Sequence, residues 1–380
     1  MIRCQFEVYE AWVSVCCSRL DPKTLRVEAI RDLGPQFVDN PHEMIGQDGA
    51  YSICLNGETL WFFGDTLIGH RVPGESLWYP GGHPVGPYDM SGKGSIKHMI
   101  NNTGLVLRDK TGRHGLKSYR YICDDRGNIR PLIPLLADEH RDEIRIWCLD
   151  GCRFEDMVYL YFTKVSMLES GLFPVNFEVL GSGLAVGNKK LWQFERVVYD
   201  GSSLLWKQNE PRFGAAVLVD PKEEWIYVYG VHQDAAKVQR CYLARVRPNQ
   251  IENREKYTYL SSPEPRWSPH ISEAVSIMHG MPTEMSVSFN PYLGCYLAVH
   301  SLDLTGKIVG RTAPEPWGPW SEPVVFHTVI AHREKPLPYP PLIYAGKEHP
   351  ELSEAGGKII YVTYVEFEEY FPHLIEVSLT

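Results

Sequence analysis

Two aspartates, Asp48 and Asp65, flank a mostly apolar run near the N-terminal end of the chain, in the stretch GQDGAYSICLNGETLWFFGDT. The Asn-Gly dipeptide at its centre is the strongest short-range signal for a two-residue β-hairpin, because both turn residues must adopt positive φ. In this hairpin Tyr51 faces Phe62, and Asp48 faces Asp65 if no bulge intervenes. Carboxylates in direct opposition repel one another, with Cβ atoms about 4.5–5.5 Å apart. A pair that costs stability calls for a functional explanation.

Cleavage of a glycosidic bond uses two carboxyl groups in different protonation states. One gives a proton to the leaving oxygen, and the other acts in its ionised form as base or nucleophile. A like charge in close opposition raises the pKa of one carboxyl, so the opposition of Asp48 and Asp65 supplies this difference. A separation of about 5–5.5 Å predicts retention of configuration, and about 6.5–9.5 Å predicts inversion. The alternative is that each aspartate is a turn former.

The elements that must position this pair are short apolar runs that end in Gly, Pro, Asn or Asp, whereas helical periodicity is weak. A strand, a turn or polar loop, and a second strand rich in Tyr, Val, Leu and Phe recur five times. The five units are YSICLNGETLWFFGDT, IWCLDGCRFEDMVYLYFTKV, AAVLVDPKEEWIYVYGV, MSVSFNPYLGCYLAVHS and KEHPELSEAGGKIIYVTYV. In each unit, residues at both odd and even positions of the strands are apolar, as in propeller blades that are buried on both faces. The sequence therefore predicts an all-β fold, a five-bladed β-propeller.

We expect residues 39–380 to form this propeller as one domain. Residues 1–38 lie outside the repeat and can supply a strand that closes the last blade, because ring closure removes a sheet edge. The first unit carries a loop insertion at about residues 69–97, which is dense in Gly and Pro. Long loops inside compact domains are often functional, and this loop follows Asp65 closely. We therefore expect it to form a rim over a site.

Ligands of a propeller bind at its central channel, which is lined by the innermost strand of each blade. We expect four units to open on an acid: Asp48, Asp150, Glu284 and Glu348. The third unit begins PRFGAAV and offers Arg212 instead, while His349 follows Glu348. Four acids that converge would repel one another. A divalent ion in the channel or Arg212 could balance them, and the sequence leaves both open.

Composition and charge exclude several classes of protein. The chain has 38 Lys and Arg against 47 Asp and Glu, a formal net charge of −9, without a basic stripe. Binding to a phosphate backbone needs clustered positive charge, so a nucleic-acid partner is not expected. No uncharged apolar run approaches about 18 residues, and Arg3, Glu7 and Glu10 interrupt the opening stretch where a signal peptide would need an apolar segment. We expect no membrane association and, by default, a cytoplasmic location.

Several motifs, taken together, resemble a known group of proteins. They are GQDGAYSICLNGETLWFFGDTLIG, NNTGLVL, WCLDG, FGAAV followed by WIYVYG, PTEMSVSFNP, and HPEL before KIIYVTYV. From about Val38 onward the chain is similar to a large group of bacterial proteins long described as a domain of unknown function. Some members are endo-D-arabinanases, and the fold of the group is a five-bladed β-propeller glycoside hydrolase. Members are commonly exported, whereas no signal peptide is visible in this chain.

The resemblance implies a carbohydrate-active hydrolase whose two important acids are Asp48 and Asp65. Further positions match the motifs of the group and are implied to bind sugar: Asn102, Asp150, Arg212, Glu284 and His349. Propeller relatives that cleave with inversion favour the wider carboxyl spacing. We therefore expect a glycoside hydrolase that acts on furanosidic, D-arabinan-like or related oligo- or polysaccharides and requires no cofactor.

Two alternatives stay open. A glycoside phosphorylase, in which phosphate replaces water, would need a cluster of Arg, Lys and His beside the acids. A non-catalytic propeller that binds glycans or protein would have an apolar channel mouth, or one without two carboxylates within about 10 Å of each other.

Overall fold

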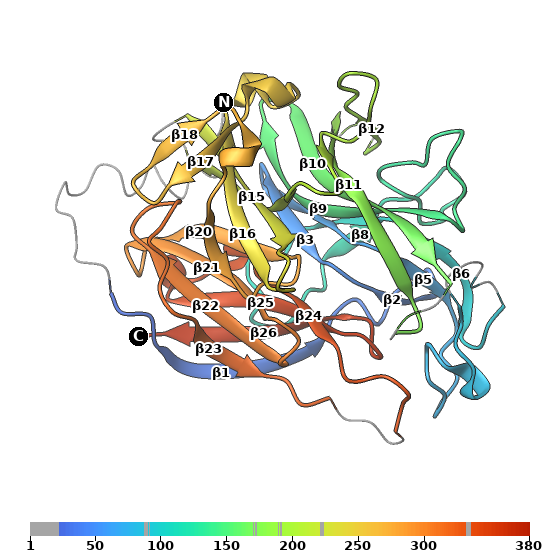
Figure 1. The fold of residues 1–380 in the computed structure, drawn as a ribbon. Coiled ribbons are helices and arrows are strands. Elements are labelled where there is room, and N and C mark those ends of the chain that lie inside the picture. Colours follow the sequence, from blue (N-terminus) through green and yellow to red (C-terminus); the bar gives the residue numbers. More distant parts are fainter. Residues whose placement is uncertain are drawn as a thin grey trace.

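The computed structural model describes residues 23–86, 90, 92–169, 171, 173–188, 190, 192–220, 224–331 and 336–380. Within these residues the protein consists of β-strands and six short 3-10 helices, with no α-helix. Five sheets of four or more strands surround a common centre, and a sixth sheet of three strands lies beside them (Figure 1). The predicted five-bladed β-propeller is confirmed. No helix among the described residues is long and apolar enough to span a membrane.

Blades 1 to 4 follow one another along the chain. Blade 1 contains β3 (Tyr51–Leu55), β4 (Glu58–Phe62), β7 (Gly104–Leu107) and β8 (Tyr119–Tyr121). Blade 2 contains β9 (Ile144–Phe154), β10 (Met157–Leu168), β11 (Asn176–Asn188) and β12 (Phe194–Arg196), with β13 (Trp206–Lys207) paired to β11. Blade 3 contains β14 (Arg212–Asp220), β15 (Trp225–Gln233), β16 (Gln239–Val246), β17 (Thr258–Ser262) and β18 (Arg266–Ser268), with β19 (Ser276–His279) paired to β16. Blade 4 contains β20 (Met285–Asn290), β21 (Cys295–Leu302), β22 (Lys307–Ala313) and β23 (Val324–Thr328).

The 3-10 helices lie in the connections between strands. They are η1 (Pro80–Gly82), η2 (Pro248–Gln250), η3 (Arg254–Lys256), η4 (Ile271–Glu273), η5 (Pro350–Leu352) and η6 (Ala355–Gly357).

Blade 5 combines strands from opposite ends of the described chain. Its strands are β24 (Ile343–Glu348), β25 (Ile359–Glu366), β26 (Pro372–Leu379) and β1 (Val27–Pro35). β1 pairs antiparallel with β26, from Val27 opposite Leu379 to Pro35 opposite His373, near the C-terminus in Figure 1. The segment before the repeat thus provides the outer strand of the last blade. Residues 1–22 of the expected N-terminal segment lie outside the described residues.

Blade 2 shows why the strands are apolar on both faces. On β10, Tyr161 belongs to a core cluster shared with Phe213 of blade 3. The next residue, Phe162, belongs to a different cluster shared with Phe62 of blade 1. Successive side chains of a strand point to opposite faces, so each face of this blade is buried against a different neighbour. A sheet buried on both sides does not show the polar alternation of a half-exposed strand.

The predicted register of the first hairpin is found, with Tyr51 opposite Phe62. Beyond blade 1 the same two segments pair again in the three-stranded sheet, where Gln47 stands opposite Thr66. That sheet contains β2 (Met44–Gln47), β5 (Thr66–Gly69) and β6 (Ile96–Ile100). The loop insertion connects the end of β5 to the start of β6. The register therefore stays constant across the junction between the two sheets.

Asn102, one of the expected sugar ligands, is fully buried between blades 1 and 2. Its Nδ2 donates to the carbonyls of Ile133 at 3.0 Å and Ile146 at 3.1 Å, and its Oδ1 accepts from the Ile133 N–H at 2.7 Å. Its φ of 40° lies in a region that Asn tolerates better than most residues. Both amide hydrogens are used by the backbone, and the side chain joins the loop before β7 to β9.

We expect Asn102→Ala to lower the free energy of unfolding by about 3 kcal/mol, because it leaves three buried backbone groups without partners at about 1 kcal/mol each. Thermal and denaturant unfolding measure this loss. The control is Asn128→Ala at an exposed turn, for which we expect a change within about 0.5 kcal/mol. Loss of sugar affinity in Asn102→Ala with unchanged stability would contradict the structural role.

Candidate active site

Asp48 and Asp65 lie at the junction between the three-stranded sheet and blade 1. The Asp48 N–H donates to the Asp65 carbonyl at 3.4 Å, and the Gly64 N–H donates to the Asp48 carbonyl at 2.9 Å. Gly49 and Ala50 follow with φ of 85° and 60°, a left-handed conformation that redirects the chain into β3. The two aspartates therefore stand opposite one another, as predicted, between the strands of the two sheets.

Asp65 forms a buried ion pair with Arg145. Arg145 Nη1 donates to Asp65 Oδ2 at 2.7 Å, and 1% and 5% of the Arg145 and Asp65 side chains are exposed. Arg145 is the second residue of β9, so blade 2 supplies the cation. The other oxygen of Asp65, Oδ1, is buried and has no hydrogen-bond partner among the described residues. Asp65 is thus paired with a cation and has one oxygen available to a further donor.

Asp48 is surrounded by groups that oppose its ionisation. Burial raises the pKa of Asp48 to about 8, and the charges of Asp65 and Glu284 add to this effect. Two phenols act in the opposite direction. Tyr344 donates to Asp48 Oδ2 at 2.9 Å, and Tyr370 also hydrogen-bonds this carboxyl group. Burial prevails, so Asp48 is mostly protonated at neutral pH while Asp65 is paired with a cation.

Lys347 supplies a buried positive charge in the channel. Its Nζ donates to the carbonyls of Gly49 and Ala345 and lies 4.2 Å from the centre of the Tyr51 ring. Burial lowers the pKa of Lys347 to about 8, against the attraction of nearby acids, first among them Glu284. Lys347 in turn opposes the rise in the pKa of Glu284 that burial causes. A lysine of blade 5 is therefore a cation that balances the acids.

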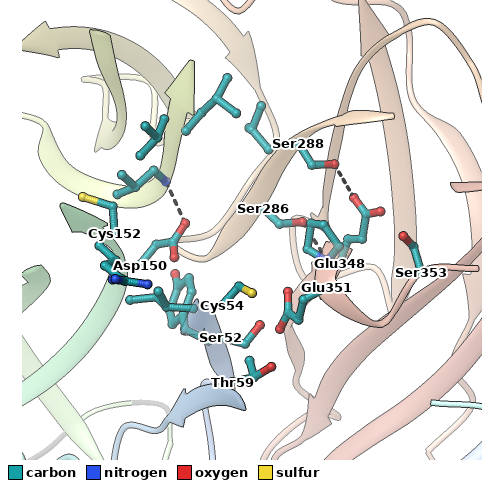
Figure 2. A pocket seen from close by; sticks show the side chains of 18 of the residues that line it. Ser52, Cys54, Thr59, Asp150, Cys152, Ser286, Ser288, Glu348, Glu351 and Ser353 are labelled. Carbon is teal, nitrogen blue, oxygen red and sulfur yellow. Dashed lines mark hydrogen bonds between the residues drawn. The ribbon is translucent and has the colours of Figure 1, made fainter. Parts of the chain in front are cut away.

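The expectation that all four acids open their strands is wrong for two of them. Asp150 lies in the second half of β9, and Glu348 is the last residue of β24. Both line a cavity of about 460 Å³ formed by residues of all five blades (Figure 2), and neither Asp48 nor Asp65 lines it. β9 begins two residues before the unit IWCLDG, and β24 begins four residues before the unit KEHPEL, so these acids lie further along their strands than expected.

Two acids that line this cavity accept hydrogen bonds from neighbouring blades. Asp150 Oδ2 accepts from the Val217 N–H at 2.7 Å, which joins blade 2 to blade 3, and Glu348 Oε2 accepts from the Ser288 hydroxyl at 2.7 Å, which joins blade 5 to blade 4 (Figure 2). Burial raises the pKa of each acid to about 7, and these hydrogen bonds oppose the rise. Their geometry is that of links between blades.

His349 is fully buried and has a partner on each ring nitrogen. Nδ1 lies 2.6 Å from Ser52 Oγ, and Nε2 lies 2.8 Å from Thr363 Oγ1. The imidazole stacks on Trp61 with ring centres 4.0 Å apart. Burial and the nearby Lys347 charge hold the pKa of His349 well below its ordinary value, so the ring is neutral. Its contacts join blade 5 to blade 1.

Arg212 and Glu284 are at the strand starts, as expected. Arg212 is the first residue of β14, and Glu284 directly precedes β20. Arg212 Nε is buried without a hydrogen-bond partner among the described residues, and burial lowers the pKa of Arg212 to about 10. Their role as sugar ligands stays a prediction.

Sequence reasoning missed four residues around the aspartates: Arg145, Tyr344, Lys347 and Tyr370. Arg145 and Tyr344 are second residues of inner strands, so correct strand starts would have identified them. Lys347 immediately precedes Glu348 in the KEHPEL motif and was overlooked beside it. Tyr370 lies in the turn between β25 and β26, for which the repeat gave no signal.

No group of three or more His, Cys, Asp or Glu side chains in the described part of the chain is arranged to hold a metal ion. The divalent ion in the channel stays a prediction.

Several solved structures are similar to this chain at low sequence identity. A protein of Bacteroides ovatus described as a "putative hydrolase" is 15% identical with a TM-score of 0.60, over 90% of this chain and 87% of that chain. A GH43 β-xylosidase/α-arabinofuranosidase from a compost microbial metagenome is 14% identical with a TM-score of 0.47, over 94% and 95%. A family 117 glycoside hydrolase of Zobellia galactanivorans is 10% identical with a TM-score of 0.48, over 92% and 90%. The first of these shows a shared fold.

None of the curated proteins matches this chain. A family model described as a domain of unknown function, DUF4185, matches residues 42–376. This range runs from just before β2 into β26 and contains every residue discussed above as part of the site. The chain belongs to the DUF4185 family.

Proposed function

We propose that the protein is a glycoside hydrolase in which Asp48 is the general acid and Asp65 is the base or nucleophile. The observation that carries this proposal is the unequal environment of two opposed carboxyl groups. Asp65 is paired with a buried arginine, whereas Asp48 lies among other acids. Glycosidic cleavage requires one protonated and one ionised carboxyl, and environments that separate two pKa values assign these roles.

Asp48 is suited to give a proton to the leaving oxygen. At neutral pH it retains a proton, because burial opposes its charged form. When that proton is transferred, the carboxylate that forms accepts hydrogen bonds from the Tyr344 and Tyr370 hydroxyls. Two donors aimed at a charge that develops during the reaction stabilise the transition state more than the ground state.

Asp65 is suited to the ionised role. Arg145 holds Oδ2, which leaves Oδ1 to take a proton from a water molecule or to attack the anomeric carbon. The two routes differ in the configuration of the first product, which proton NMR of the released sugar reads directly.

The substrate class is proposed to be a furanosidic, D-arabinan-like or related oligo- or polysaccharide, in line with the resemblance of the motifs. We propose that Arg212 and Glu284 contact sugar hydroxyls at the strand-start end of the channel. The hydrogen bonds of Asn102, Asp150 and His349 support a role in holding the blades together.

We expect Asp48→Asn and Asp65→Asn each to lower kcat on the substrate by about 10²–10⁴-fold, the range that a positioned acid or base contributes. A panel of arabinans and related furanoside polymers, with released reducing ends as readout, measures this. The control is Asp125→Asn at an exposed turn, which should keep full activity. Undiminished hydrolysis by both aspartate variants would refute the assignment, and a sugar phosphate released only with added phosphate would identify a phosphorylase.

The same two substitutions should change stability in opposite directions. The unfolded chain loses the Asp48 proton near pH 3.8 and the folded chain near pH 8, so this group reduces stability as pH rises between these values. Asp48→Asn removes that loss and should raise Tm at pH 9. Asp65→Asn takes the carboxylate charge away from the buried Arg145, which should cost about 3–5 kcal/mol. A lower Tm for Asp48→Asn at pH 9 would instead support the turn-former interpretation.

The pH dependence of kcat/KM should show an alkaline limb near pH 8. The free enzyme needs a protonated Asp48, and this form is present below about pH 8 and lost as pH rises through that value. Initial rates between pH 5 and 10 on a neutral oligosaccharide measure the limb. A profile that falls already between pH 4 and 5 would contradict Asp48 as the acid.

A further inference from the structure

The insertion packs against the turn between β25 and β26 through Trp78. This side chain is 1% exposed, and its indole N–H donates to the Phe367 carbonyl at 2.7 Å. Its ring stacks on the Phe367 ring at 4.8 Å and meets the Tyr370 ring edge-on at 4.9 Å. Next to it, the Leu77 N–H donates to the Glu368 carboxylate at 2.7 Å. The loop expected to be a rim thus packs on blade 5.

Tyr370 is held in a backbone conformation that a tyrosine rarely adopts. Its φ is 58°, and such strain persists only where the surroundings enforce it. Its carbonyl accepts from the Gln47 N–H at 2.6 Å, and its N–H donates to the Glu366 carbonyl at 2.7 Å. A Cβ at Gly46 would lie 2.9 Å from the Tyr370 ring, so the ring packs directly on the backbone of β2. The turn therefore fixes the direction of the Tyr370 hydroxyl.

We propose that Trp78 is a positioning residue for the reaction, because its packing holds the turn that presents the Tyr370 hydroxyl to Asp48. This inference rests on the proposed function, in which Asp48 is the acid. It makes the insertion part of the catalytic apparatus, connected to the acid through one phenol of blade 5.

Several titratable and charged groups act on Asp48 or on the phenols that contact it. They are Asp65, Glu284, Lys347, Tyr344, Tyr370 and Arg145. Trp78 packs on one of them, Tyr370. A hydrogen bond from Tyr370 favours the ionised form of Asp48, so its loss raises the pKa of Asp48 further.

The test is a double-mutant cycle of Trp78→Phe and Tyr370→Phe, read as the alkaline limb of kcat/KM. Tyr370→Phe should move the limb upward by about one to two units, as expected for one lost hydrogen bond to a charged group. Trp78→Phe should move it in the same direction, and should add nothing in the Tyr370→Phe background. A uniform loss of rate at every pH, or a Trp78→Phe shift that persists without the Tyr370 hydroxyl, would overturn the proposal.

Two controls separate positioning from general loosening of the fold. Trp206→Phe alters an equally buried tryptophan in the core between blades 2 and 3, and it should lower Tm without moving the limb. In a Tyr344→Phe background, which removes the other phenol donor to Asp48, Trp78→Phe should still move the limb. A limb shift in Trp206→Phe equal to that in Trp78→Phe would assign the effect to stability alone.

A second readout does not depend on turnover. The carboxyl carbon of Asp48, assigned by its absence in Asp48→Asn, reports the pKa of this group by ¹³C NMR in the intact protein. An upward shift of the Asp48 pKa in Trp78→Phe supports the positioning role, even if every furanoside tested is left uncleaved. That second result would count against the proposed substrate class instead. An unchanged titration of Asp48 in Trp78→Phe would overturn it.

Discussion

The fold depends on one constraint: each blade buries both of its faces, so the ring must close. Blade 2 illustrates this, since adjacent residues of β10 belong to the cores shared with blade 1 and with blade 3. A blade without a neighbour would expose a full apolar face. In blade 5 the final edge is covered by β1, a strand from before the repeat, which pairs along β26. Closure joins the two ends of the described chain in one sheet, with β1 as its outer strand.

Closure also brings polar side chains together in the centre, where a polar group that is out of contact with water needs a partner in the protein. Most of them find that partner on the next blade. Asn102 reaches β9, Asp150 reaches β14 and His349 reaches β3. Residue types that resemble a ligand set thus use their polar groups to link neighbouring blades.

The aspartate pair is the exception, because its partners make its two members unequal. Asp65 receives a cation from blade 2, whereas Asp48 receives neutral phenols from blade 5 and faces Glu284 of the blade 4 edge. An arrangement selected for stability alone would give both acids cations or replace them. A buried carboxyl that keeps its proton to about pH 8 is instead suited to donate that proton, and stability is lost where activity requires it.

The hairpin, the opposition of Asp48 and Asp65, and the five-unit repeat could all be predicted from the amino-acid sequence. These features depend on local interactions. An Asn-Gly turn sets the register of a hairpin within a few residues, and burial on both faces makes each strand a nearly continuous apolar run. The first residues of the inner strands could not be predicted, because a strand that is buried on both faces has no alternation of polar and apolar residues to mark where it begins. The tertiary structure placed Asp150 and Glu348 away from the pair. It also brought Arg145, Lys347 and Tyr370 to the aspartates, because the protonation of a buried acid depends on charges and dipoles supplied by segments far apart in the chain.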